Sequence, residues 1–481
     1  MEKVNGRKLS LIFIFILILL VIALLVGKLT FSYLGPTLGE DLSNEGEVTA
    51  SGDTLIFTKG SNLSLSATTD NFQTGGSNLS STTNPKVRLI ASSKTNSASA
   101  TYYVGVVINS NSYTYTTSDN TAEVILTIKD ENGNNVTSGV DGLTYVTSGG
   151  VSGFDVTGKT GLFNIKTDYP ISTTSSSTGT THTWTFTLTF VNLGTDQSDN
   201  ENASMDLDVY LQKEKILTLA EHVISQYTGS QGDDSLYYHN STLNNGAGDN
   251  SYRYAGASES VNNYICLGSD ATTCPDANLF RIIGVFGDQT KVIRAKSVGN
   301  KDWNTSDSNT WSSSSLNTYL NGTYLTSLGT LANKIATTTW KVGGGTLSNI
   351  ATSVPKTAYQ YEVGSSASTT TVDKKIGLMY VSDYYYAASP SAWTLVGYNE
   401  YDETKDYRAE TSINWLYLGS EEWTISRSSD FTTHAFFVDS TGIVGYYSVI
   451  LSNAVRPSFN LLSSTSYVSG SGSMSDPVRI N

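Results

Sequence analysis

The sequence begins with an apolar run, Leu11–Val26, that no polar or charged side chain interrupts. At about 1.5 Å of rise per residue, a helix over residues 9–27 approaches the ~30 Å apolar thickness of a bilayer. A helix that is apolar on every side leaves no face for water, which disfavours a place on a soluble domain. The run therefore predicts a transmembrane segment with the lipid bilayer as its partner.

The charges around this run predict its orientation. Lys3, Arg7 and Lys8 precede it, whereas Lys28 alone follows closely. By the positive-inside rule, residues 1–8 stay in the cytoplasm as a short tail and the remainder is exported. A cleaved signal peptide is the alternative, but the run is long and no Ala-x-Ala site follows it, which favours an uncleaved signal anchor in the plasma membrane.

Composition limits the class of protein and of partner. The 481 residues carry a formal net charge of −14, which argues against nucleic acid because phosphate binding needs clustered Lys and Arg. Tyr is abundant, with 29 residues, and Pro is scarce, with 8. Many aromatic and β-branched residues with few charges are typical of strands, so we predict a mainly β extracellular protein with polar loops.

Period-two alternation marks several strands between residues 51 and 213. The clearest is His182–Phe190, where large apolar residues alternate with threonines, and Met205–Leu211 repeats the pattern. Such alternation between turn residues indicates antiparallel sheets with one buried face. We therefore expect residues 51–213 to form an immunoglobulin-like β-sandwich, preceded by a solvated linker at residues 28–50.

A helix is expected between this domain and the next. Apolar residues recur at helical spacing within Lys215–Tyr227, and Gly229 follows them. We assign residues 214–229 to a bridging amphipathic helix and residues 230–481 to a second domain.

The second domain contains an ordered set of short segments that resembles a known family. The segments are Phe280–Val285, Asn309–Asn321, Ile376–Asp383, Trp415–Arg427, Ala454–Phe459 and Gly472–Ile480. Together they resemble a family of uncharacterised exported domains common in gut-dwelling Firmicutes. That family is similar in layout to C-type-lectin-like and formylglycine-generating-enzyme-like folds, so the resemblance implies a loop-rich mixed α/β domain with twisted antiparallel strands.

No enzymatic or cofactor role is carried over from the resemblance. The formylglycine-generating branch uses paired cysteines near its end, and this sequence has none after Cys274. The calcium-lectin triplets Glu-Pro-Asn and Trp-Asn-Asp are also missing. Asp130–Asn135 resembles the start of a calcium loop, but Asp141 replaces the expected Glu at its twelfth position, so an Asn-Gly turn is favoured. We expect no cofactor and no metal site.

The two cysteines, Cys266 and Cys274, are expected to form a disulfide bond, because export favours oxidation. A redox or metal pair would need Cys-x-x-Cys spacing or nearby histidine ligands. Catalysis is not predicted, since neither Gly-x-Ser-x-Gly nor His-Glu-x-x-His occurs. Of the four histidines, His239 and His434 lie in segments from which a ligand could be reached.

Aromatic residues provide the best candidates for ligand binding. Flat rings stack on sugar faces and Arg hydrogen-bonds hydroxyls, so we select Trp303, Trp311, Tyr385, Trp423 and Arg427. The alternative is that the rings fill the core and the Arg holds loop carbonyls.

These observations favour a membrane-anchored extracellular binding or adhesion protein with a C-terminal recognition head for a glycan or protein. A structural component of a surface layer or filament is the alternative. An enzyme of the cell envelope ranks third.

Overall fold

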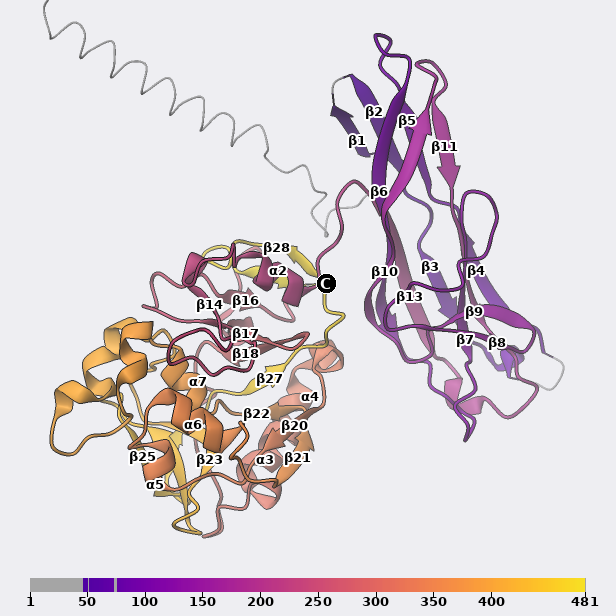
Figure 1. Cartoon of the computed structure of the whole chain (residues 1–481). Helices are drawn as coiled ribbons and strands as arrows, with labels where there is room; N and C mark the ends of the chain where they lie inside the picture. Colours follow the sequence, from indigo (N-terminus) through magenta and orange to yellow (C-terminus); the bar gives the residue numbers. More distant parts are fainter. Residues whose placement is uncertain (1–45, 51, 73–75, 481) are drawn as a thin grey trace, which may run out of the picture. The chain divides into compact units, whose positions relative to one another are not determined.

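The computed structural model describes residues 46–50, 52–72 and 76–480, which form a mainly β protein with several sheets (Figure 1). Among the described residues, the two largest clusters of buried apolar side chains share no member. One extends from Leu55 to Val209 and the other from Leu219 to Val478. We describe residues 46–213 as the N-terminal β region and residues 214–480 as the C-terminal region. The predicted domain limits themselves stay a prediction.

The predicted anchor at residues 9–27 lies outside the described residues, as do the cytoplasmic tail and most of the linker. Within the described ranges, we find no helix whose length and apolar character would carry it across a bilayer.

The described part of the N-terminal β region contains three antiparallel sheets. Their strand orders are β1-β2-β5-β11, β10-β6-β13-β3 and β4-β12-β7-β9-β8. The bounds are β1 Gly46–Ala50, β2 Asp53–Thr58, β3 Leu63–Ser66, β4 Leu79–Thr83, β5 Lys86–Ile90, β6 Ala98–Asn111, β7 Val124–Lys129, β8 Thr144–Ser148, β9 Val151–Asp155, β10 Gly161–Thr173, β11 Thr180–Thr183, β12 Thr185–Phe190 and β13 Ser204–Gln212. Two short 3-10 helices, η1 Thr69–Asn71 and η2 Ser198–Asn200, lie between strands.

The predicted strand His182–Phe190 is divided at Trp184. Residues before it pair with β5 in one sheet, and residues after it pair with β4 and β7 in another. Pro85, which has no N–H to donate, separates β4 from β5 at the same level, and its carbonyl accepts the N–H of Trp184 at 3.1 Å. The chain therefore changes sheets where a proline interrupts the neighbouring ladder.

The C-terminal region mixes strands with short helices. Its described residues form a nine-stranded sheet with the path β22-β27-β18-β17-β16-β29-β28, to which β15 and β14 are attached at β17. A five-stranded sheet has the order β19-β26-β23-β24-β25, and β20 pairs with β21. The bounds are β14 Leu236–Tyr238, β15 Tyr252–Tyr254, β16 Tyr264–Cys266, β17 Leu279–Phe286, β18 Gln289–Arg294, β19 Asn300–Asp302, β20 Thr338–Lys341, β21 Thr371–Lys374, β22 Ile376–Gly377, β23 Glu422–Arg427, β24 His434–Val438, β25 Val444–Ser448, β26 Ser452–Ala454, β27 Ser458–Asn460, β28 Tyr467–Ser469 and β29 Val478–Ile480.

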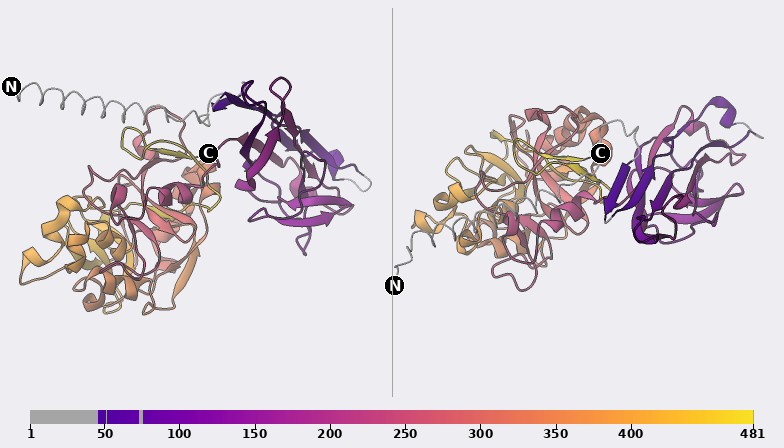
Figure 2. Two further views of the ribbon diagram at one scale, coloured as in Figure 1. Left: turned by 45° about the horizontal axis from the view of Figure 1, so that its top comes forward. Right: turned by 90° about the horizontal axis from the view of Figure 1, so that it is seen from above.

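Figure 2 shows from two further sides that helices occur among the strands of the C-terminal region, whereas the N-terminal β region is almost entirely strand. The α-helices are α2 Leu219–Ser225, α3 Ser315–Tyr319, α4 Leu325–Ser327, α5 Leu347–Ile350, α6 Pro355–Glu362 and α7 Val381–Tyr386. The other short helices are η3 Asp233–Ser235, η4 Asp276–Asn278, η5 Trp311–Ser313, η6 Leu320–Tyr324, η7 Gly329–Lys334, η8 Pro390–Thr394, η9 Glu403–Lys405 and η10 Tyr407–Ile413.

A helix is present within the expected range, but it is shorter than predicted, and its buried residues Leu219, Ala220 and Val223 belong to the core of the C-terminal region. Its N-terminal cap is Thr218, whose hydroxyl accepts the N–H of Glu221 while the Glu221 carboxylate accepts the N–H of Thr218. This reciprocal capping box starts α2 at Leu219, five residues later than the start expected from periodicity.

A disulfide bond joins Cys266, at the end of β16, to Cys274. The loop that it closes is held by Arg479 of β29, whose guanidinium donates to the carbonyls of Ser269, Ala271 and Thr272. The small loop thus becomes a docking point for the strand that runs parallel to β16.

Candidate functional site

The four aromatic rings selected from the sequence lie in the core. Trp303, Trp311, Tyr385 and Trp423 are each at most 1% exposed. The Trp303 indole donates to the carbonyl of Thr424, and the Tyr385 hydroxyl donates to that of Ile350. The Trp423 indole donates to the carbonyl of Lys301, so three of the four rings have a satisfied polar atom, whereas the Trp311 indole N–H has no partner among the described residues. The expectation of a stacking surface at these positions is therefore replaced by a core role.

Arg427 also has an internal role. Its Nε donates to the carbonyl of Gly343 at 3.0 Å, and its Nη1 donates to Oδ1 of Asn309 at 3.2 Å. The side chain is half-buried and holds loops together, which was the alternative reading of this residue.

Exposed apolar side chains concentrate at the β24–β25 hairpin instead. Seven large apolar side chains are well exposed in the part of the chain that the structure describes, and four of them lie in or beside this hairpin: Phe431, Tyr447, Ile450 and Leu451. The other three, Tyr361, Tyr401 and Met474, are scattered. Single exposed apolar residues are ordinary, whereas a cluster marks a possible interaction surface.

Three rings meet on one side of the hairpin, and we call Phe431, His434 and Tyr446 the hairpin aromatic cluster. Their centroids are 5.2 Å apart for Phe431 and His434, 5.3 Å for Phe431 and Tyr446, and 5.5 Å for His434 and Tyr446. Phe431 is 46% exposed, and the other two are half-buried. Each ring contacts the other two, and these contacts stabilise the position of all three rings at the surface.

The other face of the hairpin carries a second row of rings that begins in the core. Trp423 of β23 packs on Phe437 of β24, and Phe437 stacks on Tyr447 of β25 with centroids 5.3 Å apart. Gly445 pairs with Phe437 across the strands, and a Cβ there would lie only 3.1 Å from the Phe437 ring. The row therefore ties the hairpin to the buried Trp423.

A buried amide fixes the loop that carries Phe431. The Nδ2 of Asn309 lies 2.8 Å from each of the carbonyl oxygens of Ser428, Phe431 and His434. The N–H of Asn309 also donates to the carbonyl of Thr432. One side chain, 1% exposed, thus organises the whole turn from β23 to β24.

Polar atoms at the cluster remain available. His434 Nδ1 lies 2.9 Å from the Thr433 hydroxyl, while the described residues give no hydrogen-bond partner to His434 Nε2 or to the Tyr446 hydroxyl. Asp430, which is exposed and precedes Phe431, accepts the N–H of Leu347 through Oδ2 only. The cluster therefore combines a stacking ring with at least three free hydrogen-bonding atoms.

The C-terminal region also contains a group of buried charged side chains. Its residue types, Lys, Arg and Asp, are ones that active sites use, but their burial argues against such a role. Lys291 and Arg253 both face Asp383, and Arg253 also pairs with Asp249. Burial lowers the pKa of Lys291, and burial raises the pKa of Glu362 even though Ser426 and two main-chain N–H groups donate to it. The side chains of Lys291, Arg253, Asp383 and Glu362 are almost fully buried, so a substrate has no access to them.

His239 belongs to the same interior. It is completely buried, its Nδ1 accepts the N–H of Ala247, and burial together with the Arg253 charge lowers its pKa well below the usual value. His239 and His434 were the two histidines expected to lie within reach of a ligand, and of these two only His434 lies at the surface. No group of three or more His, Cys, Asp or Glu side chains suited to a metal ion occurs among the described residues.

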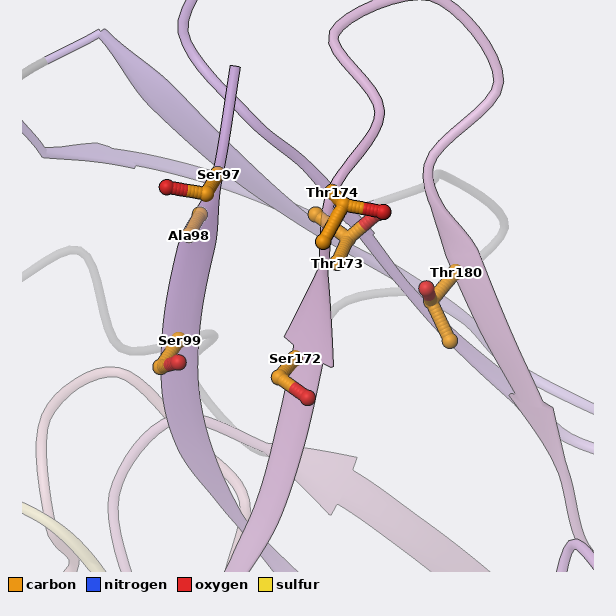
Figure 3. Close-up of a pocket in the computed structure, with 7 residues that line it drawn as sticks. All are labelled: Ser97, Ala98, Ser99, Ser172, Thr173, Thr174 and Thr180. Carbon is orange, nitrogen blue, oxygen red and sulfur yellow. The ribbon is translucent and has the colours of Figure 1, made fainter. Parts of the chain in front are cut away.

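The N-terminal β region has a shallow groove of about 420 Å³ at the ends of β6, β10 and β11 (Figure 3). Hydroxyl side chains dominate its lining: Ser97, Ser99, Ser172, Thr173, Thr174 and Thr180, with Ala98 between them. The groove offers hydrogen bonds but neither a ring nor a charge in its lining, so it gives little basis for selecting a ligand.

Comparison with protein-family models, with curated proteins and with solved structures gives no match for this chain. The functional argument therefore depends on the site itself. Sequence reasoning did not select Phe431 or Asn309. One feature of the sequence could have indicated Phe431: it is the single large apolar residue in the polar segment Ser428–Thr433, which is followed directly by His434.

Proposed function

We propose that this protein is a membrane-anchored extracellular binding protein whose recognition surface is the hairpin aromatic cluster. In this proposal, residues 9–27 anchor the chain, an immunoglobulin-like β-sandwich at residues 51–213 spaces it from the membrane, and residues 230–481 form a C-type-lectin-like head. The uninterrupted apolar run Leu11–Val26 and the basic residues that precede it support the location. The two separate cores support the division into a spacer and a head.

The observation that carries the proposal is the contrast between buried and exposed rings. Six tryptophans of the C-terminal region are at most 2% exposed, yet Phe431 is 46% exposed. An apolar ring held in water costs free energy that packing inside the protein would have recovered. Its position is nevertheless fixed by Asn309 and by two neighbouring rings, which is the preorganisation that a binding surface needs.

Binding is favoured over catalysis by the chemistry of the cluster. His434 is the one titratable base among its three rings, and Asp430 already accepts a main-chain hydrogen bond. A hydrolase needs a nucleophile with an adjacent base or a pair of carboxylates facing the same bond. The cluster supplies instead a stacking ring and rim hydrogen bonds.

The test is adhesion of the full-length chain, reconstituted in nanodiscs, to surfaces coated with mucin, collagen or fibronectin. We compare the wild type with the double variant F431A/Y446A. Selective adhesion that falls at least tenfold in the double variant is the expected result, since central aromatic anchors dominate interface energies.

The matched control is Y401A, because Tyr401 is 90% exposed and is not among the rings that contact one another in the cluster. Adhesion equal in wild type and F431A/Y446A would refute the assignment of the site. Self-association of the full-length chain at micromolar concentration without adhesion would favour the surface-layer alternative.

A further inference from the structure

We infer that the hairpin aromatic cluster binds a neutral pyranose sugar, with Phe431 stacking on its apolar face and Asp430, His434 and Tyr446 bonding its hydroxyls. This inference depends on the proposed function, because it names the ligand class of the same surface.

The ring geometry suits one sugar residue. The Phe431 and Tyr446 planes are tilted by 36° with centroids 5.3 Å apart, and the His434 ring stands at 80° to Tyr446. Because the rings are not coplanar, they do not form a flat sheet of aromatic surface, and Phe431, which is 46% exposed, is the ring that a ligand can reach. A pyranose has one C–H face of about the area of a single aromatic ring, so one open ring matches it.

The free polar atoms suit hydroxyls in particular. The Tyr446 hydroxyl, which has no partner among the described residues, can donate and accept, Asp430 Oδ1 can accept, and His434 Nε2 takes either role according to its tautomer. A ligand with adjacent hydroxyls, each both donor and acceptor, satisfies such a mixed set. An apolar peptide side chain would leave these atoms without partners, which carries a free-energy penalty when they are covered.

Charge selects among sugars. Asp430 is exposed beside Phe431, whereas the nearby Arg427 guanidinium is bonded to the Gly343 carbonyl and to Asn309, and the whole chain has a net charge of −14. A carboxylated sugar would therefore face a like charge at the rim. We expect neutral hexoses and N-acetylhexosamines to bind and acidic sugars to be rejected.

The experiment is saturation-transfer difference NMR on the full-length chain in phosphocholine micelles. The ligands are the methyl glycosides of D-glucose, D-galactose, D-mannose and N-acetyl-D-glucosamine, with N-acetylneuraminic acid and D-glucuronic acid as the charged arm. The expected result is saturation concentrated on one C–H face of at least one neutral glycoside, with no signal from either acid.

Three variants separate the contribution of the Phe431 ring to sugar binding from that of the Tyr446 hydroxyl. F431A should weaken binding roughly five- to tenfold through loss of the stacking ring, and F431W should restore it. Y446F keeps the ring and removes the hydroxyl, so a loss of roughly threefold or more is expected from the missing hydrogen bond. Y401A should bind as the wild type does, and equal thermal unfolding of all variants shows that they are folded.

The inference is overturned if no neutral glycoside is saturated at millimolar concentration, if F431A binds as tightly as the wild type, or if the acids bind better. If adhesion to a protein-coated surface still depends on Phe431 and Tyr446 while the glycosides give no signal, the proposed function stands and the sugar assignment falls.

Discussion

The side-chain amide of Asn309 lies 2.8 Å from the main-chain oxygen of Phe431, although the two residues are separated by 122 positions in sequence. The same amide reaches two further carbonyls, so the exposed ring owes its position to a buried group on a distant segment. This relationship gives the first prediction. N309A should lower the free energy of unfolding by about 1–3 kcal/mol, because buried carbonyls lose their donor.

N309A should also weaken ligand binding without touching the ligand, because the turn carrying Phe431 is no longer fixed. Denaturant unfolding measures the first effect and the adhesion assay the second. Unchanged adhesion in a folded N309A protein would contradict the positioning role.

A second prediction concerns the buried ion pairs of the C-terminal region. Lys291 Nζ lies 2.5 Å from Asp383 Oδ2, and Arg253 lies 3.7 Å from the other carboxylate oxygen. D383N leaves two buried cations without their shared partner and should cost about 3–5 kcal/mol. Chemical unfolding followed by tryptophan fluorescence reports this region, which contains six of the seven tryptophans.

The control for that experiment is K296M, because the Lys296–Asp276 pair is well exposed at both ends. An exposed pair contributes less than about 1 kcal/mol. If D383N and K296M lowered the free energy of unfolding equally, burial would not determine how much these ion pairs contribute to stability.

A third prediction concerns acid. His222 of α2 stacks on Tyr467 with centroids 3.6 Å apart, and burial lowers its pKa to about 4. Since the pKa in the folded state lies below the ordinary histidine value of about 6.5, the contribution of His222 to stability is complete above pH 6.5 and is lost as the pH falls towards 4. H222F keeps the stack and removes the titration. Its melting temperature should therefore fall less between pH 6.5 and 4 than that of the wild type, and parallel curves would count against this role.

A fourth prediction concerns the disulfide. Cys266 and Cys274 close a loop with a sequence separation of 8, so the double variant C266S/C274S should lose about 2–3 kcal/mol of stability. Because Arg479 binds three carbonyls of that loop, amide hydrogen exchange in β29 should accelerate in the same variant. Protection of β29 that does not change would mean that the loop keeps its shape without the bond.

The sequence predicted the character of the fold well where periodicity was strong. A mainly β protein is confirmed, and the alternation of His182–Phe190 correctly placed Phe186 and Leu188 in the core. The switch of that segment between two sheets was not foreseen, because it depends on Pro85, which lies about 100 positions earlier and meets Trp184 only in the folded chain.

Local propensity alone would misplace the start of α7. Lys375–Val381 is rich in strand-forming residues, yet only Ile376–Gly377 pairs as β22, and α7 begins at Val381. Asp383 accepts the N–H of Tyr380, and Glu362 accepts those of Val381 and Ser382. Glu362 comes from another helix, so tertiary contacts decide this helix start and override local propensity.

The candidate site could not be predicted from the sequence for a similar reason, because it depends on tertiary contacts. Composition revealed many rings but not which of them the fold would cover, because an aromatic side chain suits both a core and a binding surface. Phe431 lies exposed in a turn that the Asn309 side chain holds, and that contact joins segments more than 100 residues apart.

The position of β29 constrains the order in which the C-terminal region can be assembled. This strand follows every other described strand in sequence, yet it lies inside the nine-stranded sheet, parallel to β16 and antiparallel to β28. While the chain emerges from a ribosome, β16 is available some 200 residues before its parallel neighbour β29. Until Val478–Ile480 arrive, β16 remains an open edge that another chain could pair with. The pairing of β16 with β29 is thus a late step, and in the interval before it the emerging chain needs protection from its neighbours.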